Sequence, residues 1–60
     1  MKVIFVEPET PGNIGALARA INNFGKEELI LIDPQCEVET GETRARAKHA
    51  YETVKNARIL

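Results

Sequence analysis

Hydrophobic residues are gathered along the chain in blocks that predict alternating strands and helices. Lys2–Val6 contains the run Val3-Ile4-Phe5-Val6, and a second apolar run, Leu29–Ile32, ends at Asp33-Pro34. Both runs are rich in β-branched or large apolar residues, and neither alternates with polar residues. This pattern is typical of strands that are covered on both faces, as in a parallel sheet.

The stretch between these runs has the pattern of a Pro/Gly loop followed by an amphipathic helix. Its start has two interpretations: Thr10 is the N-cap with Pro11 in the first turn, or Asn13 is the N-cap. The helix is predicted to run through Phe24, and Gly25 suits the left-handed position that follows a helix. The apolar residues of this helix recur at i, i+3, i+4, i+7 and i+10, on one stripe: Ile14, Leu17, Ala18, Ile21 and Phe24.

After a loop over residues 34–41, the same spacing predicts a second helix from about Glu42 to Ala57. Its stripe comprises Ala47, Ala50, Tyr51, Val54 and Ala57, and its opposite, solvated face comprises Arg44, Lys48, Glu52 and Lys55. Lys48 and Glu52 have the i, i+4 spacing of a weak ion pair. Residues 58–60 are predicted to begin a third strand. The fold class is therefore α/β, a βαβα piece with the start of a third strand in a parallel sheet.

Length and charge limit what this piece can do by itself. Sixty residues with a single cysteine, Cys36, allow one small domain and no internal disulfide. The net charge of −1 gives no overall electrostatic footprint for nucleic acid. The opening residues lack a signal-peptide pattern and no run reaches membrane-spanning length, which favours a cytoplasmic location.

Two polar residues of the first predicted helix are candidates for a binding or catalytic site. Arg19 falls well off the apolar stripe, and its guanidinium is a fixed fork of donors that suits phosphate. A solvated surface arginine is the alternative. Asn13 stands at the helix mouth, where capping alone explains an asparagine. Gly12 and Gly15 permit close backbone approach, although a helix–sheet contact explains Gly15 equally well.

The remaining polar residues have simpler explanations. Glu7 and Glu9 lie in a loop with no histidine or metal partner nearby in sequence, so they are predicted to be solvated rather than an acid–base pair. His49 is predicted to lie on the surface, and Cys36 has no partner that would mark a nucleophile. The basic residues Arg44, Arg46 and Lys48 are split between helix faces by their spacing of two, which favours a solvated face over a phosphate-binding cluster.

The string P-G-N-I-G-A-L-A-R-A-I-N-N-F-G resembles motif 1 of the SpoU/TrmH-type RNA ribose 2′-O-methyltransferases of the SPOUT superfamily, and is closest to the TrmJ-like tRNA enzymes. The matching positions are Asn13, Gly15, Arg19 and Gly25 behind a short apolar strand. The resemblance implies that Arg19 is catalytic and RNA-binding, engaging the RNA backbone at the target ribose and helping to activate its 2′-hydroxyl. It also implies that Asn13 is a catalytic-site residue that holds the active-site loop in place.

The resemblance further implies S-adenosylmethionine as methyl donor, RNA and most closely tRNA as substrate, and a homodimer. Members of the family bind the cofactor in a C-terminal α/β knot, and residues 1–60 carry no pattern for a knot, a cofactor site or a metal site. These residues are therefore expected to be the N-terminal part of one SPOUT methyltransferase domain and to be inactive alone. Two alternatives stay open: a non-catalytic α/β half-module that binds phosphate or RNA, and a structural segment without a function of its own.

Overall fold

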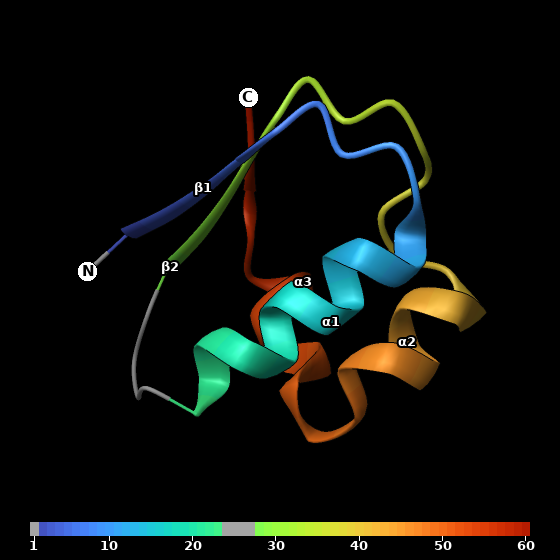
Figure 1. The fold of residues 1–60 in the computed structure, drawn as a ribbon. Coiled ribbons are helices and arrows are strands. Elements are labelled where there is room, and N and C mark those ends of the chain that lie inside the picture. Colours follow the sequence, from blue (N-terminus) through green and yellow to red (C-terminus); the bar gives the residue numbers. More distant parts are fainter. Residues whose placement is uncertain (1, 24–27) are drawn as a thin grey trace.

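The computed structural model describes residues 2–23 and 28–60, which form a small parallel sheet and a layer of helices (Figure 1). The elements in chain order are β1 (Lys2–Val6), α1 (Pro11–Asn22), β2 (Glu28–Ile32), α2 (Gly41–Ala47), the 3-10 turn η1 (Lys48–Ala50), α3 (Tyr51–Lys55) and β3 (Arg58–Ile59). The predicted α/β class and its βαβα order with a third strand are confirmed. No described helix has the length and apolar character needed to cross a bilayer.

The sheet has the strand order β1-β2-β3, and both neighbouring pairs are parallel. Val6 is the register partner of Ile32 in the first pair, and Leu31 is the partner of Ile59 in the second. Backbone hydrogen bonds continue the pairing past the strand ends, with the Glu7 amide donating to the Ile32 carbonyl at 2.7 Å. The carboxyl ends of β1 and β2 therefore lie together, above the start of α1 (Figure 1).

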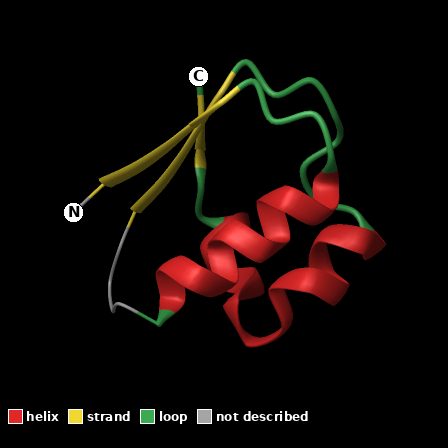
Figure 2. Cartoon of the chain, in the orientation of Figure 1, coloured by secondary structure: helices red, strands yellow, loops and turns green. Residues whose placement is uncertain are grey.

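The helices lie on one side of the sheet (Figure 2), and the core fills the space between the two layers. Leu29 and Leu31 of β2 face this core, where they join buried residues of the helices: Ile14, Ala18, Ile21, Ala47, Ala50 and Val54. The predicted apolar stripe of α1 is thus its packed face over the residues described. Tyr51 and Ala57 complete the second predicted stripe as half-buried residues against the same core.

The prediction that both apolar strands are covered on two faces is confirmed for β2 and wrong for β1 in this chain. Leu29, Ile30 and Leu31 are all buried, but Ile4 and Val6 are each 56% exposed. The reason is geometric, because successive side chains of a strand point to opposite faces and β1 lies at an edge with helices on one side only. Ile4 and Val6 therefore belong to an open, apolar sheet face.

Helix α1 begins after Thr10, which has extended backbone angles (φ −126°, ψ 134°), and Pro11 occupies the first turn. The interpretation with Thr10 as N-cap is therefore correct and the alternative with Asn13 is wrong. Thr10 makes no side-chain capping bond, so the fixed φ of Pro11 contributes more to starting this helix. Asn23 is the C-cap. The predicted extension through Phe24 and the role of Gly25 lie outside the described residues.

The single helix predicted over Glu42–Ala57 is wrong, because the chain is broken at Lys48. This residue has φ 54° and ψ −119°, which interrupts the helical hydrogen bonding and separates α2 from α3. The break turns α3 beneath α1, so that Ala47, Ala50 and Val54 all reach the core. Glu52 consequently pairs with Lys55, at 3.8 Å, rather than with Lys48 as predicted.

Candidate functional site at the junction of α1 and α2

Gly15 allows α2 to lie directly against the backbone of α1. A Cβ atom added at Gly15 would overlap the Thr43 carbonyl oxygen and would lie 2.9 Å from the Arg46 Cβ and 3.0 Å from the Ala47 nitrogen. Side chains other than hydrogen therefore do not fit unless the helices separate. The glycine serves a helix–helix contact, not the helix–sheet contact considered from sequence, and it places the start of the Arg46 side chain beside α1.

Thr43 fixes the position of α2 along α1. Its side chain is fully buried, and its Oγ1 donates a hydrogen bond to the Pro11 carbonyl at 3.3 Å. Its backbone amide donates to the Thr40 Oγ1 at 3.1 Å, which caps the start of α2. The start of α2 is thereby held against the first turn of α1, and Arg46, three residues after Thr43, lies on the neighbouring part of the same helix.

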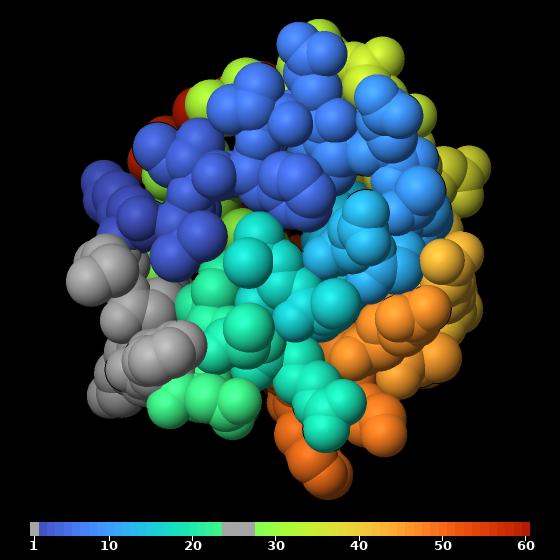
Figure 3. All heavy atoms as spheres, in the orientation of Figure 1, coloured from blue at the N-terminus to red at the C-terminus, as the bar shows by residue number. Residues whose placement is uncertain are grey.

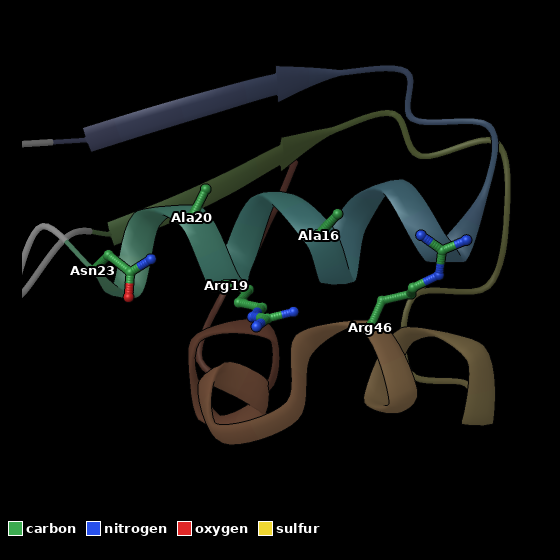
Figure 4. A pocket seen from close by; sticks show the side chains of 5 residues that line it. All are labelled: Ala16, Arg19, Ala20, Asn23 and Arg46. Carbon is green, nitrogen blue, oxygen red and sulfur yellow. The ribbon is translucent and has the colours of Figure 1, made fainter.

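A shallow hollow lies on the surface between the two helices. Its lining consists of Ala16, Arg19, Ala20 and Asn23 from the α1 side and Arg46 from α2. Figure 4 shows Arg19 projecting from α1 on the side of α2, and Arg46 rising from α2 to the level of α1. Figure 3 shows α1 (cyan) against α2 (orange) on an open face of the molecule. The hollow thus presents two guanidinium groups, one amide and two methyl groups to solvent.

The candidate residues Arg19 and Asn13 both lie on α1, but they do not share this hollow. Arg19 is exposed and lines it, as its position off the apolar stripe predicts. Asn13 is exposed in the first turn of α1, about a turn and a half away. Only its backbone amide takes part in starting the helix, donating to the Thr10 carbonyl at 3.2 Å. Capping therefore no longer explains the Asn13 side chain, which is presented to solvent.

Arg46 is a site residue that the sequence interpretation missed. The spacing of two between Arg44 and Arg46 correctly put them on different faces of a helix, but it did not say which face meets α1. The structure answers this: Arg46 lines the hollow, whereas the Arg44 guanidinium carbon lies 4.8 Å from the centre of the Tyr51 ring. Gly15 is the feature of the sequence that could have indicated this contact, since a glycine within a helix allows another segment to pack closely against it.

The other polar candidates do not form a second site within residues 2–23 and 28–60. Glu7, Glu9 and His49 are exposed, and the described residues contain no group of side chains suited to a metal ion. Cys36 is half-buried and its Sγ donates to the Pro8 carbonyl at 3.6 Å. Burial, and secondarily the charge of Glu42, raises the pKa of the Cys36 thiol, so it is a poor nucleophile at neutral pH.

The chain is an α/β module in which α1 and α2 cross closely and pack beside a parallel sheet. The exposed Arg19 of α1 gives this module a site suited to an anion. Residues 1–59 match the sequence model of the SpoU rRNA Methylase family. The chain therefore belongs to this family, as its resemblance to motif 1 predicts.

Three relatives match over nearly the whole chain. It is 37% identical over all 60 residues to the tRNA (cytidine/uridine/adenosine-2′-O-)-methyltransferase TrmJ of Pseudomonas aeruginosa. It is 38% identical over 59 residues to the tRNA (cytidine-2′-O-)-methyltransferase TrmJ of Methanocaldococcus jannaschii. It is 33% identical over 60 residues to an uncharacterized tRNA/rRNA methyltransferase of Haemophilus influenzae. The chain covers 23%, 25% and 24% of the length of these relatives, about a quarter in each case.

The hollow between α1 and α2 does not fit S-adenosylmethionine, which the family implies. Two guanidinium groups line it, and they would repel the positive sulfonium of the cofactor. The remaining lining is one amide and two alanine methyl groups, which provide no apolar slot for an adenine ring. The chemistry of this hollow suits an anion with several acceptor oxygens instead.

Proposed function

We propose that residues 1–60 are the N-terminal part of a SPOUT methyltransferase domain that methylates the 2′-hydroxyl of a tRNA ribose. The proposal is supported by membership of the SpoU family, by the names of its TrmJ relatives, and by the exposed position of Arg19. The single observation that carries the site is Arg19 itself, which is held on a packed helix beside a hollow whose described lining residues include no carboxylate. S-adenosylmethionine supplies the methyl group, from a site outside these residues.

The chemistry requires a cation near the target ribose. A ribose 2′-hydroxyl is a weak nucleophile at neutral pH, so its oxygen must be oriented and its developing negative charge stabilised. The Arg19 guanidinium keeps its charge throughout the working pH range and can donate to a phosphate and to the ribose oxygen from one planar group. Asn13, whose side chain is exposed and not used for capping, is the second catalytic-site residue of this proposal.

Assembly and location follow the same proposal. The enzyme works as a homodimer in the cytoplasm in this proposal. Residues 1–60 alone are expected to be inactive, because the family binds its cofactor in a C-terminal knot. A phosphate-binding module without catalysis remains the alternative, and it is favoured by the same hollow, since two arginines suit a phosphodiester whether or not chemistry follows.

The first test is Arg19→Lys in the complete protein that contains residues 1–60. Lysine keeps the charge but lacks the fork, so single-turnover methylation of tRNA should fall by about 100-fold or more. Affinity for S-adenosylmethionine, measured by titration of the same variant, should stay unchanged. Arg44→Lys is the matched control, because Arg44 lies over Tyr51 and outside the hollow. Near-normal methylation by Arg19→Lys would refute the assignment of Arg19, and binding without any methylation by the unmodified protein would favour the non-catalytic module.

A further inference from the structure

We infer that Arg46 is a second RNA-backbone ligand, which binds a phosphate across the α1–α2 junction together with Arg19. The inference rests on the proposed function, and it adds a residue of a different helix to the site. Its basis is the hollow that both guanidinium groups line, and the close packing that holds the two helices at a fixed separation.

The contacts of the four described arginines separate them into two kinds. Arg44 lies over the Tyr51 ring, and the Arg58 Nε lies 4.0 Å from a carboxylate oxygen of Glu28. Arg19 and Arg46 form no ion pair with any carboxylate in the described parts of the chain, and both are exposed at one hollow. Two arginines that have no ion pair with a described carboxylate and that line one depression can offer their donors to an anion from outside.

The two arginines gather at one hollow in a chain that has no overall positive charge. The chain carries one more acidic than basic residue, 9 against 8. The hollow nevertheless gathers two positive charges, and the described residues that line it include no acidic group. Ala16 lies along α1 between Arg19 and Arg46, while Ala20 and Asn23 lie beyond Arg19, so that Asn23 adds an amide donor at one end (Figure 4). The result is a local anion site on a surface that is otherwise balanced or acidic.

The geometry favours a phosphodiester over a small free anion. Figure 4 shows the two guanidinium groups apart from one another rather than converging on one point. An RNA backbone offers a phosphate with two non-bridging oxygens and further phosphates on either side, so it can engage both donors at once. Arg46 then positions the strand while Arg19 serves the target ribose, and Arg46 itself touches no reacting atom.

The test measures RNA affinity separately from chemistry. Arg46→Gln is made in the complete protein, and the Kd for an unmodified tRNA transcript is measured over a range of salt concentrations without methyl donor. Loss of one phosphate contact should lower the slope of log Kd against log salt by about 0.7–0.9. Affinity at physiological salt should fall about tenfold. Methylation at subsaturating tRNA should fall in parallel with the affinity, and by more than the rate at saturating tRNA, since Arg46 contributes to binding and touches no reacting atom.

Arg44→Gln is the matched control, because it removes the same charge from the same helix but outside the hollow, and its salt slope should stay unchanged. Arg46→Lys should recover most of the slope, because a lysine still neutralises a phosphate. An unchanged slope for Arg46→Gln, or equal slope changes for Arg46→Gln and Arg44→Gln, would overturn the inference. So would a loss of the methylation rate with normal tRNA affinity. These outcomes do not depend on the Arg19→Lys test. Near-normal methylation by Arg19→Lys would overturn the catalytic role of Arg19, but it would not change the salt slope expected for Arg46→Gln.

Discussion

Gly15→Ala isolates the helix contact on which the site is built. The added methyl would lie against the Thr43 carbonyl oxygen, 2.9 Å from the Arg46 Cβ and 3.0 Å from the Ala47 nitrogen. Real Cβ atoms essentially never approach other heavy atoms closer than 3.0 Å. Because two of the three atoms belong to the α2 backbone, no change of rotamer can relieve the overlap. The helices must move apart, which weakens the buried contacts of Thr43 and Ala47.

Two opposing terms set the size of the effect. Alanine in a helix interior is about 1 kcal/mol more favourable than glycine. Overpacking of a close-packed site costs about 1–3 kcal/mol, and we place this site at about 2–3 kcal/mol because the neighbours are backbone atoms. The net loss in the free energy of unfolding is therefore about 1–2 kcal/mol. In a domain of 150–250 residues each kcal/mol lowers Tm by about 2–4 °C.

The measurement is denaturant unfolding of the complete protein, followed by circular dichroism, with two further glycines as controls. Gly41→Ala should be nearly neutral, since a Cβ there meets nothing within 4 Å. Gly12→Ala should fall between the two, because the Cβ would lie 2.5 Å from the Glu42 Oε2, at the end of a flexible side chain that can move away. If Gly15→Ala is as stable as Gly41→Ala, the close approach of α2 to Gly15 is wrong and the hollow loses its structural basis.

Two further predictions concern the sheet face and the thiol. The 60-residue chain alone should sediment as an oligomer, because Ile4 and Val6 are each 56% exposed on an open sheet face. The double variant Ile4→Thr, Val6→Thr should shift the chain toward monomer. A monomeric unmodified chain would contradict this prediction. Alkylation of Cys36 by iodoacetamide should reach half-maximal rate at a higher pH than in the denatured chain, because burial raises the pKa of the thiol. Glu42→Gln should lower this midpoint, because the Glu42 charge is the smaller of the two causes that raise the pKa. A midpoint at or below that of the denatured chain would refute it.

The strands and the first helix follow from local pattern alone. The stripe containing Ile14, Ala18 and Ile21 fixes which face of α1 packs, and it leaves Arg19 exposed, as the structure shows. These features depend on side chains close in sequence, so periodicity is enough to predict them. The sequence could not show that the outer face of β1 is open, because coverage depends on which layers are present rather than on the strand itself.

The break at Lys48 and the place of Arg46 required tertiary information. Lys48 has a positive φ without a glycine or proline to mark it, and nothing in the local sequence predicts a helix end there. The conformation is kept because it lets Ala47 and Ala50 both face the core. Arg46 meets α1 only through Gly15, a contact between segments far apart in sequence, so helical spacing could separate it from Arg44 but could not assign it to the site.

The small residues of α1 give the site both its stability and its charge arrangement. Gly15 draws α2 close, which buries Thr43 and so offsets the modest core of a short chain. The same approach brings Arg46 to the side of α1 that carries Arg19, one helical turn after Gly15. A larger residue at Gly15 would separate the helices and with them the two arginines. The close crossing of α1 and α2 and the proximity of Arg46 to Arg19 therefore both require a residue without a side chain at position 15. For this reason the candidate site lies beside the closest helix contact.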